Sequence, residues 1–143
     1  MPDSDRASAL MLLAVEIDDS SYISIVREGH RYRPVLRIRR TDPENLRVLH
    51  QHFGGTFAQS SNGYWYWSVT HRRATALMRE VYPEVHVKRE HLDSIFQLEE
   101  SKKRTKRSRG ARLTESEKAF RQELIDRIKE LNKSQTSHEQ APD

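Results

Sequence analysis

Five arginines lie close together between positions 31 and 40, and their spacing predicts contact with nucleic acid. In the segment RYRPVLRIRR (31–40), Tyr, Pro, Leu and Ile alternate with a second set that is mostly arginine, which is typical of a half-buried strand. Arginines on a strand in the major groove can pair with guanine edges or grip phosphates. We therefore predict DNA contacts from Arg31, Arg33, Arg37, Arg39 and Arg40. The alternative is a solvated strand face, although such a face usually mixes charges and this segment holds no acid up to Thr41.

A second strand segment would extend this surface with hydroxyl and aromatic side chains. In YWYWSVT (64–70), the alternation places Trp65, Trp67 and Val69 on one face. We expect the tryptophans to be core residues rather than stacking platforms, because large aromatics usually bury their area. The residues that would extend the DNA-binding surface are Tyr22, Ser24, Tyr64, Tyr66, Ser68 and Thr70. Each of them could equally be a plain exposed strand residue.

The segments between these strands predict helices. Residues 7–18 are rich in Ala, Leu and Met and apolar nearly all round, which favours a helix covered on both sides. Asp42 and Pro43 suit a helix start, and Gly54-Gly55 suit its end. The predicted elements are a helix over 7–18, strands over 21–28 and 31–40, a helix over 43–53, strands over 55–60 and 64–70, and helices over 72–82, from about 88, and from 114 to about 132. This order predicts an α+β fold with helices on one face of an antiparallel sheet.

Composition limits the class of protein. The 143 residues suffice for about one domain, and 25 Lys and Arg against 21 Asp and Glu give a mild net charge of +4. The chain has no cysteine, which excludes disulfides and thiolate metal sites and fits a reducing cytosol. The longest apolar run, 9–15, is far shorter than the roughly 20 residues of a membrane span. We expect a cytoplasmic protein associated with the nucleoid, without a membrane segment.

The distribution of polar residues predicts the domain boundaries. The predicted regions are a disordered N-terminus at 1–6, a DNA-binding domain at 7–101, a basic linker at 102–112, a C-terminal helix at 113–133 and a disordered tail at 134–143. The segment KKRTKRSRGAR (102–112) holds seven basic residues and no acidic one. It could bind phosphate without sequence preference or serve only as a solubilising linker. Thr114 to Glu117 form a capping box for the last helix.

The order αββαββα, with the segment LAVEIDDSS (13–21) running into a strand, resembles the LAGLIDADG homing endonucleases. Further matches are Thr41-Asp42, Phe53-Gly54-Gly55, Trp65-x-Trp67-x-Val69, the segment PEVHVKR (83–89) and residues 113–133. Together they cover roughly residues 9–133. The resemblance implies a curved four-stranded antiparallel sheet that reads DNA, with helices on its other face.

The resemblance also implies partners and chemistry. With one copy of the motif, the chain would read half of a long duplex site as a homodimer or heterodimer. The 7–18 helix, with Leu12, Val15 and Glu16, would pack at the dimer axis. Mg²⁺ at the end of the motif would stabilise developing charge and lower the pKa of an attacking water.

The motif departs from the family pattern at its catalytic end. Ser20 stands where the family carries its metal-binding carboxylate, Asp18 aligns with a more structural aspartate, and Asp19 lies one residue early. Lys88 matches the basic active-site position. The predicted catalytic residues are Asp19, Lys88 and the degenerate position Ser20, with Asp19 and Asp18 as metal ligands.

Three functions remain open from the sequence. The leading hypothesis is a site-specific, magnesium-dependent DNA endonuclease of an intron or phage mobile element. The alternatives are a catalytically inactive DNA-binding regulator with the same fold, and one half of a heterodimeric nuclease whose partner supplies the intact acid.

Overall fold

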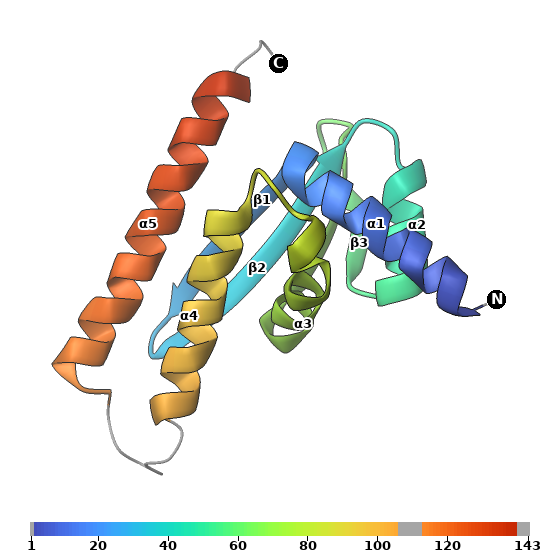
Figure 1. The fold of residues 1–143 in the computed structure, drawn as a ribbon. Helices are drawn as coiled ribbons and strands as arrows, with labels where there is room; N and C mark the ends of the chain where they lie inside the picture. The colour runs from blue at the N-terminus through green and yellow to red at the C-terminus, as the bar shows by residue number, and fades with distance from the viewer. Residues whose placement is uncertain (1, 106–112, 140–143) are drawn as a thin grey trace.

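The computed structural model describes residues 2–105 and 113–139, and within them the predicted element order is confirmed. The elements are α1 (Pro2–Ser20), β1 (Ser21–Glu28), β2 (Arg31–Arg40), α2 (Glu44–Phe53), β3 (Thr56–Gln59), β4 (Trp65–Thr70), α3 (His71–Val81), the 3-10 helix η1 (Tyr82–Glu84), α4 (Arg89–Thr105) and α5 (Glu115–Glu139) (Figure 1). None of the helices in these two stretches is long and apolar enough to cross a membrane.

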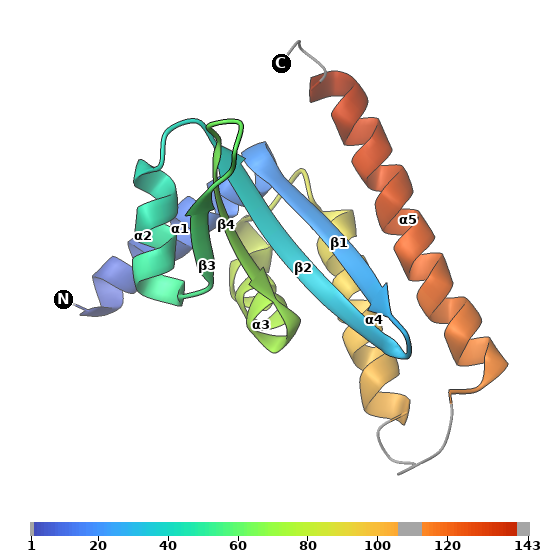
Figure 2. The same cartoon turned by 180° about the vertical axis from the view of Figure 1, so that it is seen from behind.

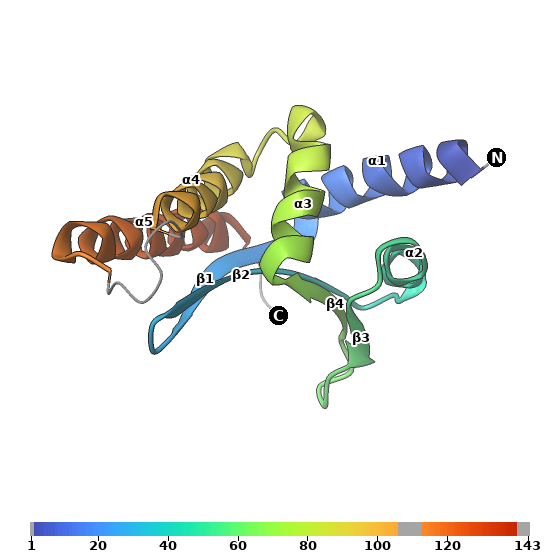
Figure 3. The same cartoon turned by 90° about the horizontal axis from the view of Figure 1, so that it is seen from below.

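The strands form one antiparallel sheet in the order β1-β2-β4-β3. Figure 2 shows the sheet in front of α1, α3 and α4, so one of its faces is not covered by these helices. Seen from below, the sheet is curved, with its concave side turned away from the helices (Figure 3). Antiparallel strands with one packed face read as alternating sequences, which is why the pattern of β2 was visible in the sequence.

The core lies between the sheet and the helices. Leu36 and Ile38 from β2 and Trp67 from β4 are fully buried there, together with Leu13 and Ile17 from α1. Trp67 is therefore a core residue as predicted. Trp65 is only half-buried, and its ring stacks on that of Phe57 with centroids 5.3 Å apart.

Gly55 is required between α2 and β3, where the chain lies directly against β4. Its φ is +89°, a value that side chains disfavour, and an added Cβ would lie 2.5 Å from the carbonyl oxygen of Ser68. The neighbouring Gly54 carbonyl accepts a hydrogen bond from the Trp67 indole at 2.7 Å. The two glycines thus do more than end the helix, because they let β4 and its core tryptophan approach it closely.

The predicted N-terminal region spans 1–6, whereas α1 begins at Pro2, so residues 2–6 belong to this helix and residue 1 lies outside the described residues. Arg6 connects this N-terminal part of α1 to the rest of the fold. Its guanidinium forms an ion pair with Glu80 of α3 at 2.7 Å and lies over the Phe53 ring of α2. These partners are far away in sequence, so local composition did not reveal them.

The predicted linker and tail are also shorter than expected. Residues 102–105 belong to α4, since Arg121 of α5 donates hydrogen bonds to Ser101 and Thr105 and fixes the last turn. Residues 134–139 belong to α5, because no glycine or proline interrupts the chain before Pro142. The remaining parts of these two predictions, 106–112 and 140–143, lie outside the described residues.

A buried histidine joins α4 to α5 and to β1. His91 is buried, and its Nε2 lies 3.1 Å from the Asn132 side-chain oxygen. The Asn132 amide in turn donates to the carbonyl of Ile23 at 2.9 Å. Burial, and then the charge of Lys88, lowers the pKa of His91 to about 4. The fold therefore holds this imidazole neutral.

Acidification should consequently destabilise the protein through His91. The folded pKa of about 4 lies below the usual 6.5, so the unfolded chain binds more protons between these values. The stability contributed by His91 is fully present above pH 6.5 and is lost as the pH falls towards 4. We expect a loss on the order of 2 kcal/mol in the free energy of unfolding between pH 7 and 4, measured in urea. The His91→Gln variant should lack this component, and an unchanged pH profile in that variant would contradict the assignment.

Candidate nucleic-acid interface

The concave face of the sheet gathers most of the predicted DNA-binding residues. Because side chains alternate along a strand, Arg31, Arg33, Arg37 and Arg39 all leave β2 on the side opposite to the buried Leu36 and Ile38. The register places Arg37 beside two residues of neighbouring strands, Tyr22 of β1 and Ser68 of β4. The other predicted strand residues on this face are Ser24 and Thr70, which both pair with position 35, and Tyr66, which pairs with position 39.

Two of the arginines are supported by tyrosines. The Arg37 guanidinium carbon lies 4.0 Å from the ring centroid of Tyr66, and that of Arg39 lies 4.4 Å from the ring centroid of Tyr64. Such cation–π contacts restrict long side chains that are otherwise free. Both arginines remain exposed, and no ion pair in the described part of the chain involves either of them. Their charges are thus available to a ligand.

Arg33 differs from these two residues. Its guanidinium forms an ion pair with Glu28, the last residue of β1. The segment 31–41 itself holds no acidic residue, but the β1–β2 hairpin brings Glu28 beside Arg33. Among the described residues, the positive charges that β2 places on the concave face without an ion pair are therefore those of Arg31, at the start of the strand, and of Arg37 and Arg39, towards the end that lies near the motif.

Arg40 does not lie on this face, which corrects its predicted position. Position 40 shares the alternation of Leu36 and Ile38, so its side chain points towards α1. There it donates to both carboxylate oxygens of Glu16, with 2.8 Å between Nε and one oxygen, and to Asp19 at 2.8 Å. Hydrogen bonding to Glu16 is the main cause that raises the pKa of Arg40. The guanidinium is thus committed to α1.

Glu16 is likewise not available on the predicted dimer helix surface. Its side chain is only 1% exposed, because it faces Arg40 rather than solvent. By contrast, Val15 is 58% exposed and Met11 51%, with Leu12 half-buried beside them. The apolar stripe on the outer side of α1 is therefore formed by Met11, Leu12 and Val15.

Asp18 has a structural role in this arrangement. Its carboxylate accepts hydrogen bonds from the backbone N–H groups of His86, Val87 and Lys88, at 2.9 to 3.1 Å. These three residues immediately precede α4. Both oxygens of Asp18 are occupied in this way, which ties the end of α1 to the start of α4.

The three predicted catalytic residues lie near the point where α1 passes into β1. Asp19 is exposed and accepts hydrogen bonds from Arg40 and, at 3.2 Å, from the Ser20 hydroxyl. The ammonium of Lys88 is buried and donates to the Ser21 carbonyl at 2.7 Å. The structure therefore brings Lys88 close to the motif, although it is far away in sequence.

This end of the motif offers few ligands to a metal ion. Asp18 is taken by backbone groups, Asp19 is paired with a cation, and Ser20 supplies a neutral hydroxyl. Within residues 2–105 and 113–139, no three His, Cys, Asp or Glu side chains converge in a way that could hold a metal. The donor set of one chain does not fit a resident Mg²⁺, which prefers carboxylate and phosphate oxygens.

The Glu16–Arg40 pair is the feature that sequence reasoning missed. Two signals pointed to it: an acid in the middle of an otherwise apolar helix, and an arginine that shares its alternation with inward residues of β2. Either one could have been an exposed charge. Only the tertiary structure shows that the Glu16 carboxylate and the Arg40 guanidinium are in contact and neutralise each other.

Solved structures that share this fold include homing endonucleases. I-CvuI, in complex with the I-CreI target in the presence of 2 mM Mg with DNA not cleaved, aligns with a TM-score of 0.72 and 20% identity over 90% of this chain and 83% of its own. The archaeal intron-encoded I-Vdi141I, complexed with DNA, gives 0.65 and 14% over 90% and 85%. I-TnaI gives 0.60 and 15% over 94% and 97%. No family model and no curated protein matches the chain. The predicted LAGLIDADG-like fold is thus confirmed.

Arg40 and Arg37 should separate stability from surface charge, since they lie on opposite sides of the same strand. Arg40→Ala leaves the buried Glu16 carboxylate without its cation and should lower the free energy of unfolding by about 3 kcal/mol. Arg37→Ala removes an exposed side chain and should change it by less than about 0.5 kcal/mol. Urea unfolding measures both values. Glu16→Gln in the Arg40→Ala background should recover part of the loss, and equal effects of the two arginines would contradict this account.

Proposed function

We propose that the concave face of the sheet binds double-stranded DNA in a sequence-specific manner. The observation that carries the proposal is the pair of exposed arginines, Arg37 and Arg39, each stacked on a tyrosine in the middle of an uncovered, curved sheet. A two-stranded ribbon fits the major groove, which is about 12 Å wide, and arginine can donate two hydrogen bonds to a guanine there. The stacked rings hold the guanidinium groups in place, which reduces the entropy lost on binding.

The neighbouring side chains suit the rest of such an interface. Tyr22, Ser24, Ser68 and Thr70 can donate to or accept from base edges and phosphates without adding charge. The solved structures of I-CvuI and I-Vdi141I with the same fold are complexes with DNA, which supports this choice of ligand. A duplex DNA ligand also implies an intracellular, nucleoid-associated location for this chain.

Pairing through α1 is part of the proposal. The exposed Met11 and Val15, with Leu12, offer an apolar stripe of the kind that a second helix covers. A symmetric dimer would bring two Asp19 carboxylates near the axis, and such like charges repel. Arg40 supplies each of them with a cation from its own chain, so the repulsion is offset without a metal. Each subunit would then read half of a longer site.

The first test is selection of bound duplexes from a randomised library, followed by measurement of affinity for the enriched site. Arg37→Ala should weaken binding by about 1–3 kcal/mol, roughly 5- to 150-fold, and relax the preference at one base pair. Arg127→Ala is the matched control, because Arg127 is an exposed arginine on α5 rather than on the concave face. Its affinity should change little. No enrichment by the wild-type protein, or equal losses in the two variants, would overturn the proposal.

Magnesium-dependent cleavage is a second candidate function, favoured by the closeness of Asp19 and Lys88 to the same end of β1. The neutral Ser20 and the pairing of Asp19 with Arg40 weigh against it, because one chain then lacks an uncommitted carboxylate for the ion. We therefore place binding without cleavage first. A heterodimer with a partner that carries the intact acid would be a further route to activity.

The two candidates differ in their response to Mg²⁺ on the selected site. We expect the wild-type protein to bind this site and leave both strands intact in the presence of Mg²⁺. Ser20→Asp places a second carboxylate beside Asp19 and should permit cleavage if the remaining geometry of a nuclease persists. Denaturing electrophoresis of end-labelled DNA measures the products. Cleavage by the wild-type protein would show instead that the enzyme hypothesis is right.

A further inference from the structure

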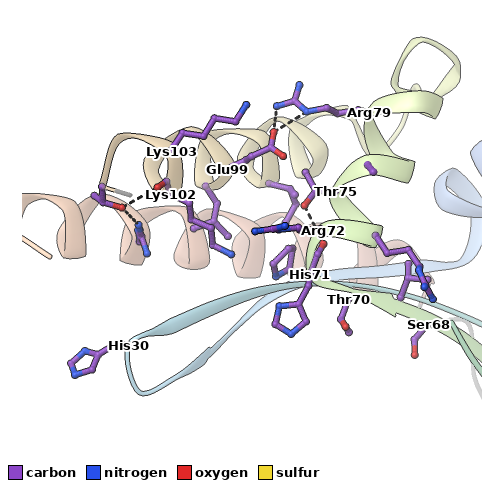
Figure 4. Close-up of a pocket in the computed structure, with 18 of the residues that line it drawn as sticks. His30, Ser68, Thr70, His71, Arg72, Thr75, Arg79, Glu99, Lys102 and Lys103 are labelled. Atoms are coloured by element: carbon purple, nitrogen blue, oxygen red, sulfur yellow. Dashed lines mark hydrogen bonds and ion pairs between the residues drawn. The ribbon is translucent and has the colours of Figure 1, made fainter. Parts of the chain in front are cut away.

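A large open cavity lies between the sheet and helices α3 and α4 (Figure 4). Its volume is about 1840 Å³, and the start of α5 also contributes to its wall. Pockets for small ligands usually measure about 300–1,000 Å³, so this one can hold an extended ligand together with water. The DNA-binding proposal uses Ser68 and Thr70, which are among the lining residues of the cavity, but none of the cavity's basic side chains.

Seven Lys and Arg side chains line this cavity, and three of them, from three different helices, carry the argument. They are Arg72 from α3, Lys102 from α4 and Arg121 from α5. Figure 4 shows Arg72 and Lys102 projecting into the space between α3 and α4. Across the described residues, no ion pair involves any of the three. Their charges are therefore not balanced by a carboxylate in direct contact.

Arg121 is an unusual member of this group because it is only 5% exposed. Its hydrogen bonds go to the hydroxyl groups of Ser101 and Thr105, at 2.8 and 3.0 Å, rather than to an acid. A buried charge without an opposite charge is costly. Burial accordingly lowers the pKa of Arg121, and burial together with repulsion by Arg121 and Arg72 lowers the pKa of Lys102.

The nearby acids offset this repulsion only in part: the charge of Glu117 raises the pKa of Arg121 and that of Glu99 raises the pKa of Lys102, but both pKa values stay lowered. Glu99 lines the cavity, but it accepts two hydrogen bonds from Arg79 (Figure 4). Glu117 accepts from Ser101 and Arg104. The sequence from Lys102 to Thr114 contains no acidic residue, so the adjoining chain cannot contribute a counter-charge.

The backbone adds to the positive potential. Helix α3 begins at His71 in the wall of the cavity, and its N-cap residue Thr70 makes no side-chain capping hydrogen bond. The first N–H groups of a helix carry a partial positive charge and favour anions. His71 also has a φ of +56°, the one positive value among non-glycine residues in the described ranges, which gives this helix start an uncommon backbone path.

We propose that this cavity binds phosphate groups, with Arg72, Lys102 and Arg121 as the charged ligands. Phosphate fits better than a single carboxylate because it can carry more than one charge and accepts paired hydrogen bonds from guanidinium groups. The phosphate has two conceivable sources: a free oligophosphate, or the backbone of DNA that extends past the concave face. The binding site itself does not depend on the DNA-binding function proposed above.

Calorimetric titration of the full chain with inorganic tripolyphosphate at constant ionic strength tests this site. We expect saturable binding by the wild-type protein, and a loss of affinity of about tenfold or more in Lys102→Gln and in Arg72→Gln, because each variant removes a charged hydrogen-bond donor. Lys129→Gln is the matched control, since Lys129 is an exposed lysine of α5 that does not line the cavity. The control should bind like the wild-type protein. Absent binding, or equal losses in all three variants, would overturn the proposal.

Thermal unfolding separates a binding role from a structural one. Without tripolyphosphate, Lys102→Gln should melt at or above the temperature of the wild-type protein, because the variant relieves repulsion from Arg121. With tripolyphosphate, the melting temperature should rise in the wild-type protein and not in the variant. A Lys102→Gln protein that is less stable without the ligand would argue for a structural lysine and against the site.

A competition arm identifies the source of the phosphate. If a duplex of random sequence displaces tripolyphosphate from the wild-type protein, and Lys102→Gln lowers the salt dependence of duplex binding, the ligand is the DNA backbone. If tripolyphosphate stays bound in the presence of saturating duplex, the ligand is a free oligophosphate. Both results support a phosphate site in the cavity.

Discussion

The pairing of Glu16 with Arg40 is the interaction on which the arrangement of the motif depends. A carboxylate that is only 1% exposed requires a cation close by, and Arg40 can reach it only from the last position of β2 on the helix side. The pair therefore fixes the end of β2 against α1. Because strand side chains alternate, the same constraint directs Arg37 and Arg39 to the opposite, concave face. The ion pair thus holds Arg40 on the core side, while the alternation of β2 leaves Arg37 and Arg39 available to a ligand.

The end of α1 serves as a junction for three elements, all through short polar contacts. Arg40 of β2 donates a hydrogen bond to Asp19 of α1. Asp18 of α1 accepts hydrogen bonds from the backbone that precedes α4. Lys88, in that same segment, donates to the Ser21 carbonyl at the start of β1. Each of these residues aligned with, or lay close to, a position that the resemblance associates with catalysis or dimer packing. In this chain the same residues are largely committed to holding the fold together, which is why binding is the function that its geometry favours.

The molecule separates its positive charge into two regions with different properties. On the concave face, Arg37 and Arg39 are exposed and supported by tyrosine rings, an arrangement suited to reading an extended duplex. In the cavity, Arg72, Lys102 and Arg121 are drawn together by three helices, and Arg121 is buried. Charges on an exposed face are screened by solvent, whereas charges in a cavity repel each other strongly. The second region therefore carries an electrostatic cost that an anion would remove.

The sequence by itself determined the element order, the antiparallel sheet and the face of β2 that carries Arg31, Arg33, Arg37 and Arg39, because alternation and helix caps are local signals, while the curvature of the sheet was implied by the family resemblance. Local signals did not reveal that residues 2–6 and 102–105 are helical, since the contacts of Arg6 and Arg121 join these helices to residues far away in sequence. Only the tertiary structure decided that Arg40 belongs to Glu16, that Asp18 caps α4, and that three basic residues from separate helices share one cavity. A charge's role depends on its distance to other charges and to water, and that distance is set by packing rather than by sequence spacing.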